Sequence, residues 1–296
     1  MAIVQSKSHR WRKVAAHTFL LCLCAAVVFP FLVVLSVSLR KGNFASGSLW
    51  PSEISLEHWR YVLGFPSIGP DGKSVMPDLP VLLWLWNSIK VALASATVTL
   101  LLSTTASFAL ARIPFKGRRH LMTGLMLMQM FPAVLALVAI YAIFDRLGAA
   151  FPAIGLNTHT SLVLAYSGGI ATHVWTLKGY YETLPSEIEE AATVDGATPW
   201  QAFWRVLLPM ATPILVVVFM LAFIGAVIEY PVASILLTQQ DQLTLAVGSN
   251  LFVHEHNFHW GDFAAAAILS GLPITLVFLL AQRWMISGLA AGGVKG

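Results

Sequence analysis

The chain has 296 residues, of which 57% are hydrophobic and 11% are charged, and its formal net charge is +4. An average soluble protein has about 25% charged residues, so this composition excludes an ordinary soluble globular protein. The basic residues form no contiguous patch of the kind that binds nucleic acid, and we expect no nucleic-acid partner. The composition instead predicts a protein that lies in a lipid bilayer.

Stretches without Asp, Glu, Lys or Arg recur along the chain. Each is long enough to cross a bilayer core, which needs about 20 helical residues. A soluble helical core would show polar faces at the helical period, and these stretches lack them. We therefore predict an all-α integral membrane protein with six transmembrane helices. The stretches are 14–39, 91–111, 121–144, 147–177, 206–228 and 263–282.

The first stretch follows a basic arm, as a signal peptide does, but it is far longer than the 7–15 apolar residues of a signal peptide. We expect it to be retained as the first helix. Lys and Arg gather in this arm and in the loop at 112–119, which places both in the cytoplasm. The predicted organisation is a cytoplasmic arm (1–13), a first helix (14–39), a periplasmic loop (40–81), a five-helix core (82–290) containing a cytoplasmic loop (185–209) and a periplasmic loop (231–262), and a cytoplasmic tail (291–296).

The loop at 40–81 is rich in Gly and Pro, and the spacing of Leu56, Trp59 and Leu63 predicts a short amphipathic helix in it. Gly72-Lys73-Ser74 is similar to the end of a phosphate-binding loop, but the glycine required five positions earlier is Ser67. We therefore expect no nucleotide site in this chain. In the stretch 121–144, Gln129 is the polar residue among methionines, and an interhelical hydrogen bond would explain it.

The segment 185–209 is the most informative part of the sequence. Ser186 and Glu189 have the spacing of a capping box, which predicts a helix that begins at Glu187, and Gly196 is placed to end it. Thr198, Pro199 and Gln201 then predict the start of a second helix, which continues into the stretch 206–228. Without further information, this short acidic helix fits a solvated loop as well as a docking element.

Two further features lie beyond this segment. Glu229, at the end of the fifth stretch, has either a packing or gating role or is a simple interfacial carboxylate. His254, His256 and His259 gather in the last loop, where we expect polar loop residues and no metal site.

A spaced motif lies in this segment and reads EAA-x3-G-x9-I-x-LP, with Val206 where Ile is usual. It consists of Glu190-Ala191-Ala192, Gly196 and the run 206–209. This pattern resembles the signature of permease subunits of ABC importers, which also precedes the penultimate span on the cytoplasmic side. Phrases along the whole chain resemble the maltose and maltodextrin permeases of that family: 82–88, 155–159, 195–203, 260–267 and 290–296.

The resemblance implies a type I ABC-importer permease fold with both termini in the cytoplasm, in the bacterial inner (cytoplasmic) membrane. It implies a non-catalytic subunit that forms the path for maltose or maltodextrins with a second permease subunit (MalF-like). The other implied partners are a homodimeric ATPase (MalK-like), a periplasmic maltose-binding protein and the lipid bilayer. ATP and Mg²⁺ would be used by the ATPase, with no cofactor bound by this chain. The sugar site would lie mainly on the second permease, which leaves substrate-binding residues here unassigned.

The resemblance also assigns three sets of residues. The ATPase-coupling set is Glu187, Glu190, Ala191, Ala192, Asp195, Gly196, Leu208 and Pro209. The ATPase-contacting tail is Gly292, Gly293, Val294, Lys295 and Gly296. The loop facing the binding protein contains Gln242, Ser249, Asn250, His254 and Asn257.

Two alternatives remain open. The first is a permease for another oligosaccharide. The second is a secondary transporter driven by an ion gradient, which would have charged residues near the middle of several spans and broken helices in paired positions. The charge-free stretches disfavour the second alternative. We expect no membrane enzyme, since no nucleophile–base pair or metal-ligand spacing emerges.

Overall fold

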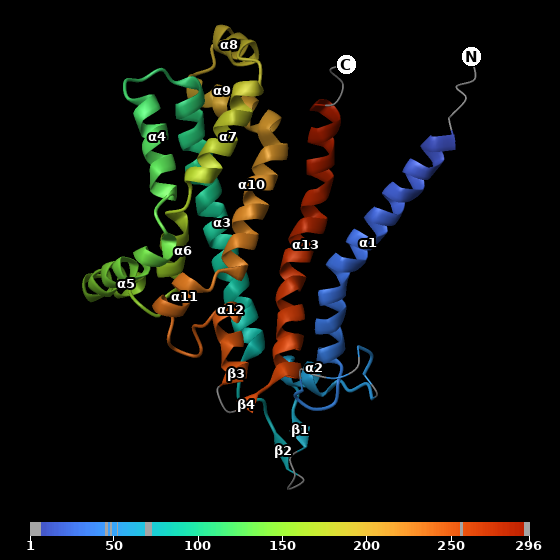
Figure 1. The fold of residues 1–296 in the computed structure, drawn as a ribbon. Helices are drawn as coiled ribbons and strands as arrows, with labels where there is room; N and C mark the ends of the chain where they lie inside the picture. Colours follow the sequence, from blue (N-terminus) through green and yellow to red (C-terminus); the bar gives the residue numbers. More distant parts are fainter. Residues whose placement is uncertain are drawn as a thin grey trace. The chain divides into compact units, whose positions relative to one another are not determined.

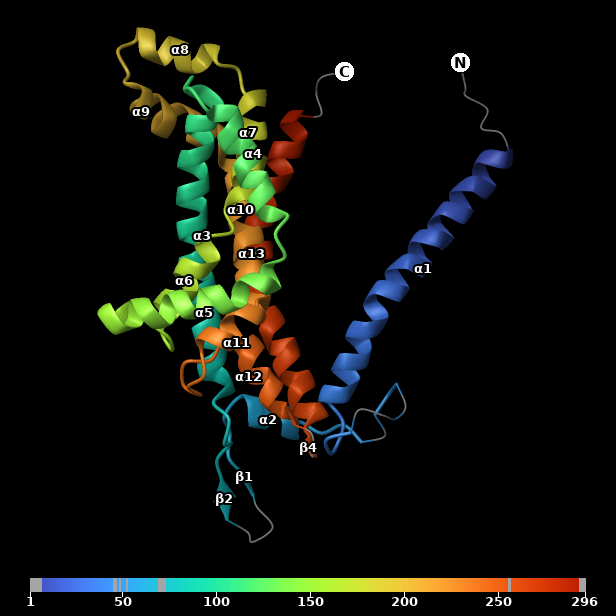
Figure 2. The same ribbon diagram turned by 60° about the vertical axis from the view of Figure 1, so that its left-hand side comes forward.

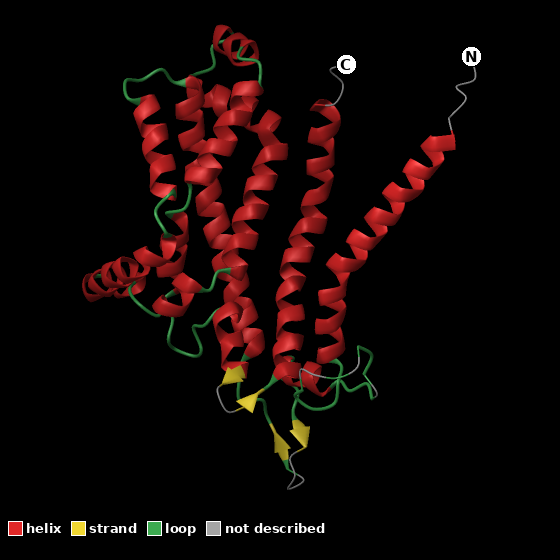
Figure 3. Cartoon of the chain, viewed as in Figure 1, coloured by secondary structure: helices red, strands yellow, loops and turns green. Residues whose placement is uncertain are grey.

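The computed structural model describes residues 7–44, 47, 49–51, 53–68, 73–254 and 257–292. The chain is mostly helical, and among the described residues strands form only two short antiparallel hairpins (Figures 1 and 3). It divides into two compact units. Unit 1 contains Met1–Pro80 and Leu251–Leu269, and unit 2 contains Val81–Asn250 and Ser270–Gly296.

Unit 1 begins with the 32-residue helix α1, Lys7–Ser38. The predicted amphipathic helix near Leu56–Leu63 is confirmed as α2, Glu57–Val62, and the indole of Trp59 donates a hydrogen bond to Ser38 at 3.3 Å. The two hairpins are β1–β2 and β3–β4, and the unit ends with the first residues of α13. The bounds are Ser67–Ile68 for β1, Ser74–Val75 for β2, Val253–His254 for β3, Asn257–Phe258 for β4 and Trp260–Gly292 for α13.

Unit 2 is built around α3, Val81–Arg112, and α10, Leu208–Ile228, which run side by side in Figures 1 and 2. Phe223 of α10 is buried in a cluster with Ala92 and Ala96 of α3. The remaining elements of unit 2 are, in chain order, α4 (Arg118–Gln129), α5 (Ala133–Ala150), η1 (Pro152–Ile154), α6 (His159–Ser167), α7 (Ala171–Thr183), α8 (Glu187–Val194), α9 (Pro199–Ala202), η2 (Phe203–Leu207), α11 (Pro231–Leu236) and α12 (Leu245–Gly248). The short helix η3 (Ser249–Phe252) contains the last residues of this part of unit 2 and the first residues of the second segment of unit 1.

The stretch 121–144 is not one helix, contrary to our expectation. α4 ends at Gln129 and α5 begins at Ala133, because Pro132 lacks a backbone N–H and disfavours helical geometry in the residue before it. In both views α5 lies across the direction of α3, while α4 runs along it (Figures 1 and 2). The expected interhelical bond is confirmed: Thr172 of α7 donates to the side chain of Gln129 at 2.6 Å.

The stretch 147–177 is also interrupted. It contains the end of α5, the 3-10 turn η1, α6 and most of α7, with Gly168 and Gly169 between the last two helices. Both α6 and α7 pack on α3, and the hydroxyl of Ser107 donates to the carbonyl of Val174 at 2.9 Å.

The described part of the chain therefore contains five helices long and apolar enough to cross a membrane. They are Trp11–Ser38, Val81–Arg112, Ala133–Ala150, Pro199–Ile228 and Trp260–Met285. Four of them contain the predicted stretches 91–111, 206–228 and 263–282 and nearly all of 14–39. The breaks at Pro132 and Gly168-Gly169 account for the difference from six.

Candidate functional site

The short acidic helix α8 lies across one end of the α3–α7–α10 bundle (Figures 1 and 2). It begins at Glu187 as expected, but the predicted capping box is wrong. Ser186 has helical backbone angles, φ −69° and ψ −24°, and its side chain makes no capping bond. Glu189 turns toward α3 instead, where the guanidinium of Arg112 donates to its carboxylate at 2.7 Å.

This ion pair anchors the loop. The side chains of Arg112 and Glu189 are only 17% and 15% exposed, so water screens the pair less than it screens a surface pair. Arg112 also donates to the carbonyl of Leu184 at 3.0 Å, just before α8 begins. One residue at the end of α3 therefore contacts both the helix and the chain that leads into it.

The opposite face of α8 is exposed in the part of the chain that the structure describes. Glu187, Glu190 and Ala191 are exposed, and Val194, one turn further on, is 88% exposed. Helical positions i, i+3, i+4 and i+7 share one face, so these four residues form a single surface. Ala192 lies on the half-buried side with Glu189. The predicted coupling residues of α8 thus fall mainly on an exposed surface that combines two carboxylates with small apolar side chains.

The predicted helix end at Gly196 is confirmed. Gly196 has φ +90°, its N–H donates to the carbonyl of Thr193 at 3.0 Å, and the N–H of Ala197 donates to Ala192 at 2.9 Å. These two bonds form a Schellman motif, which favours glycine because a Cβ is strained at positive φ. Asp195 is exposed beside this turn.

The predicted start of the second helix is confirmed as well. The hydroxyl of Thr198 accepts from the N–H of Gln201 at 3.3 Å, and the Gln201 side chain accepts from the N–H of Thr198 at 2.8 Å. Pro199 occupies the first position of α9. The helix then continues into α10 through η2, a π-helical turn in which the N–H of Leu208 donates to Phe203. Pro209 follows this turn.

The second helix is fixed to the bundle by aromatic packing. Phe203 and Leu207 are buried in a cluster with Phe108 of α3 and with Leu177 and Tyr181 of α7. The ring centroids of Phe203 and Phe108 lie 4.5 Å apart. Of the remaining predicted coupling residues, Leu208 is half-buried against this cluster and Pro209 is exposed. The second helix therefore packs against α3, α7 and α10 together.

At the other end of α3, the residues around 237–245 are held closely. Trp84 donates to the carbonyl of Gln240 at 2.6 Å, and the buried amide of Asn87 donates to Asp241 and Leu243, both at 2.9 Å. Gly248 packs so closely on the Trp84 ring that a Cβ there would lie 2.3 Å from it. This half of the last loop is therefore held by hydrogen bonds and close packing against α3.

Two further residues hold the same segment. The side-chain oxygen of Asn157, which has φ +58°, accepts from the N–H groups of Thr238 and Gln239 at 2.6 and 2.9 Å. His159 donates through Nε2 to the carbonyl of Gln242 at 2.9 Å.

The predicted binding-protein-facing residues thus have different surroundings. Ser249 bonds to its own helical turn at Leu245, and Asn250 is exposed and donates to the hydroxyl of Tyr230 at 3.1 Å. His254 and Asn257 pair in the β3–β4 hairpin. His256 lies outside the described residues. Of the tail, Gly292 is the last residue of α13, and Gly293, Val294, Lys295 and Gly296 lie outside the described residues.

Glu229 has a packing role in the structure. One carboxylate oxygen accepts from the N–H of Val232 at 2.8 Å, and the other accepts from Ala233 at 3.0 Å and from the hydroxyl of Tyr166 at 2.7 Å. It therefore caps the turn that begins at Pro231.

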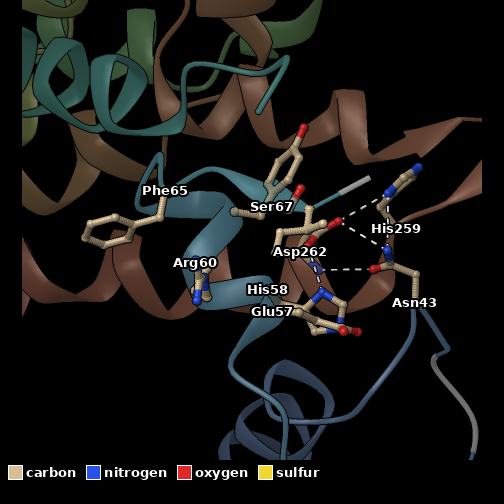
Figure 4. A pocket seen from close by; sticks show the side chains of 10 residues that line it. Asn43, Glu57, His58, Arg60, Phe65, Ser67, His259 and Asp262 are labelled. Carbon is tan, nitrogen blue, oxygen red and sulfur yellow. Dashed lines mark hydrogen bonds and ion pairs between the residues drawn. The ribbon is translucent and has the colours of Figure 1, made fainter. Parts of the chain in front are cut away.

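Unit 1 has a cavity of about 490 Å³ near the start of α13, and most of the residues that line it have polar side chains (Figure 4). The carboxylate of Asp262 accepts from the buried His58 at 2.7 Å and lies 3.2 Å from His259. The side-chain oxygen of Asn43 accepts from the N–H groups of Gly261 and Asp262 at 3.0 and 3.3 Å, which caps α13. His259 thus belongs to this hydrogen-bonded group, which ties the chain after α1 to α13.

Sequence reasoning missed the anchors of both loops. The sequence indicates Arg112 only as a charge that sets topology and Trp84 only as an interfacial aromatic residue, and it predicts no hydrogen-bonding role for Trp84, Asn87 or Asn157. One signal was present for Asn87: a polar amide beside two tryptophans at the start of a long apolar helix needs hydrogen-bond partners.

Residues 102–290 match the family model of the binding-protein-dependent transport system inner membrane component. Maltose/maltodextrin transport system permease proteins MalG from Salmonella typhimurium and Photorhabdus laumondii are 58% and 57% identical to the chain, over 100% of both sequences in each case. A crystal structure of a bacterial ABC transporter involved in the import of the acidic polysaccharide alginate shares the fold, with a TM-score of 0.76 and 20% identity over 94% of this chain and 98% of that one. The MetNI methionine ABC transporter matches less fully, with a TM-score of 0.57 and 16% identity over 70% of this chain and 95% of that one.

Proposed function

Because the chain belongs to the family of binding-protein-dependent transport system inner membrane components, we propose that it is a permease subunit of an ATP-driven importer for maltose and maltodextrins. The sugar follows from relatives that are 56–58% identical along the whole chain. A likeness at 20% identity to a polysaccharide importer supports the fold alone. Membership in this family also disfavours the secondary-transporter alternative.

In this proposal the chain crosses the bacterial inner membrane six times and binds no cofactor. α6 and α7 together act as one broken span, since both lie along α3. A second permease completes the path, a cytoplasmic ATPase dimer uses ATP and Mg²⁺, and a periplasmic binding protein delivers the sugar. The chain itself catalyses no reaction.

The observation that carries the mechanism is the attachment of α8 to the bundle. The exposed surface of Glu187, Glu190, Ala191 and Val194 would seat in the ATPase, where small side chains permit close approach and carboxylates accept charge-assisted hydrogen bonds. The opposite side of α8 is anchored to α3 by Arg112. Closure of the ATPase dimer would thus move α8–α9 as a rigid element and rearrange the spans.

The test uses the reconstituted importer in proteoliposomes. Glu190→Ala should lower maltose uptake by about tenfold or more while the complex still assembles, because a buried charged hydrogen bond at an interface is lost. The matched control is Glu53→Gln, an exposed carboxylate far along the chain from the EAA sequence. Normal coupling of ATP hydrolysis to uptake in Glu190→Ala would contradict the docking role. Uptake by this chain alone with a proton gradient would contradict the function.

A further inference from the structure

A cavity of about 560 Å³ opens in unit 2 between the loop that follows α3, the start of α4 and the second half of α7. α4 packs beside α7 at the end of the bundle where α8 lies (Figures 1 and 2). Arg118 and Arg119 of α4 and Lys178 of α7 line the cavity. Like charges repel, so the convergence of three cations from two helices on one space requires an explanation.

The protein itself neutralises only part of this charge. One carboxylate oxygen of Glu182 accepts from Arg118 at 3.0 Å and from Lys178 at 2.7 Å. Arg119 is exposed, and its guanidinium makes no hydrogen bond or ion pair in the part of the chain that the structure describes. Three cations and one carboxylate leave a net charge of +2 at the cavity, which therefore favours an anion.

Exposed apolar side chains lie about one turn from the cations on both helices. Leu121, three residues after Arg118, is 49% exposed, and Trp175, three residues before Lys178, is 56% exposed. Helical positions three apart share a face, and they differ in height by about 4.5 Å. Because α4 leads away from the end of the bundle at α8 and α7 leads toward it, both apolar residues lie on the inner side of the cations (Figures 1 and 2).

An anionic phospholipid matches both features of this surface. Its phosphate accepts charge-assisted hydrogen bonds from arginine and lysine, and basic pockets between transmembrane helices bind such headgroups. Its acyl chains would cover Leu121, and tryptophan is enriched at the depth where headgroup and hydrocarbon meet. A soluble phosphate would leave Leu121 and Trp175 in water. A zwitterionic headgroup would bring its own cation to a cavity that already has a net positive charge.

We propose that this cavity binds the phosphate of an anionic membrane phospholipid, such as phosphatidylglycerol, whose acyl chains lie along α4 and α7. The site goes beyond the proposed function, since it requires a lipid bilayer and is independent of the imported sugar. The bound headgroup joins the start of α4 to α7 beside Glu182, two residues before the carbonyl of Leu184 that Arg112 holds. The lipid therefore stabilises the helix that leads into α8.

The first test measures lipid binding to the complete importer complex. The complex is purified in detergent, depleted of lipid and titrated with dioleoyl-phosphatidylglycerol or dioleoyl-phosphatidylcholine, and native mass spectrometry measures the affinity of the tightest-bound molecule. We expect phosphatidylglycerol to bind more tightly. Arg119→Gln should weaken its binding by about tenfold, the effect of one lost charged hydrogen bond, and Arg119→Lys should retain most of the affinity. ATP-dependent maltose uptake by the same preparation tests the proposed function separately.

Lys116→Gln is the matched control. It removes the same charge from the adjacent loop, but Lys116 does not line the cavity, so the affinity for phosphatidylglycerol should stay nearly unchanged. Equal weakening by Lys116→Gln and Arg119→Gln would show a general attraction to surface charge and overturn the site. Equal affinity of the wild-type complex for the two lipids, or unchanged affinity in Arg119→Gln, would overturn it as well.

The second test distinguishes a lipid from other anions. A ligand that binds the folded state raises the midpoint of thermal unfolding, so phosphatidylglycerol should raise the midpoint of the lipid-depleted wild-type complex more than that of Arg119→Gln. Inorganic phosphate should produce no such difference. A rise with inorganic phosphate that Arg119→Gln abolishes would assign the cavity to a soluble phosphate and overturn the lipid proposal. Loss of the ATPase from the Arg119→Gln complex with either lipid would identify a contact with a partner protein and overturn it equally.

Discussion

Arg112 is the residue on which the position of α8 depends. Its guanidinium serves the carboxylate of Glu189 and the carbonyl of Leu184 at once. Lysine cannot reproduce this geometry, because the planar fork of arginine offers several fixed donors and an ammonium is a point charge. Removal of Arg112 therefore costs two contacts, whereas a neutral side chain at 189 weakens one.

We predict that Arg112→Ala loosens α8 more than Glu189→Gln does, with Arg112→Lys between them. Loss of a partly buried charged hydrogen bond costs about 1–3 kcal/mol. Hydrogen exchange of the amides at 187–195 measures the local effect, and maltose-dependent ATP hydrolysis measures coupling. Lys41→Ala, which breaks a pair whose side chains are 70% and 68% exposed, is the control and should change neither. Equal exchange in Arg112→Ala and wild type would rule out the anchor.

His58 introduces a pH dependence in unit 1. Burial alone would lower the pKa of His58, but the hydrogen bond to Asp262 and the charges of Asp262 and Glu57 outweigh it, so the pKa is raised above 6.5. His259, Asn43 and the carbonyl of Gly42 complete the surroundings of the pair. A pKa that is higher in the folded state than in the unfolded state means that the protonated histidine stabilises the fold. This stabilisation is fully present below the pKa of the unfolded state, and it is lost as the pH rises through the pKa of the folded state.

We expect unit 1 to lose protection as the pH rises above about 6.5, the ordinary pKa of histidine. Limited proteolysis or hydrogen exchange of residues 53–62, measured across this range, detects the change. His58→Gln should abolish the pH dependence. His259→Gln, whose histidine is 41% exposed, should preserve most of it. Protection that instead increases with pH in the wild-type protein would contradict the assignment to His58.

At the scale of elements, the sequence predicted hydrogen bonds between residues close in sequence, and it did not predict those between distant residues. Gly196 and the Thr198 box were predictable because their hydrogen-bond partners lie within four residues. The capping box predicted at Ser186 does not form, because the Glu189 side chain that it requires bonds to Arg112, which lies 77 positions away in sequence. The hydrogen bonds that Asn87 and Asn157 make to 237–245 join positions 81 to 156 apart in sequence, as in the contacts of Asn157 with Thr238 and of Asn87 with Leu243, and no local sequence pattern predicts such pairs.

We predict that Asn87→Ala frees the segment 237–245. Two carbonyl groups lose their donor, and each group left unpaired in a buried setting costs about 1–3 kcal/mol. The midpoint of thermal unfolding should fall, and amide exchange should increase at 237–245. Thr105→Ala is the control on the same helix, since its exposed hydroxyl bonds only to its own turn. A change in Thr105→Ala as large as that in Asn87→Ala would refute this explanation.

At the scale of the whole molecule, the proposed topology has six crossings. Five described helices are long and apolar enough to span, and the paired short helices α6 and α7 supply the proposed sixth. The composition predicted that the protein lies in a membrane, and the charge-free stretches predicted the approximate positions of the spans. Neither predicted the breaks, because a charge-free run has the same composition whether or not Pro132 interrupts it.

Reporter fusions distinguish the two counts. With six crossings, fusions at the N-terminus, at 114–117, at 195–198 and at the C-terminus report the cytoplasm. Fusions at 63–66 and 238–241 then report the periplasm. With five crossings the two termini would lie on opposite sides, and that outcome would exclude the six-span topology. Activity of the complex with each fusion checks that the fusion has not altered insertion.

The π-helical turn at Phe203–Leu207 has a consequence for helical phase. An α-helix rotates about 100° per residue, so eight residues overshoot two full turns by about 80°. Phe203 and Ala211 are eight residues apart, yet both are buried in the same cluster. The wider turn absorbs most of that overshoot and brings Phe203, Leu207 and Ala211 onto one side. Removing one residue within 204–206 would leave seven steps from Phe203 to Ala211, which fall only about 20° short of two full turns in an ordinary α-helix. The deletion would therefore remove the π turn while Trp200 and the surface offered by α8 keep nearly the same direction.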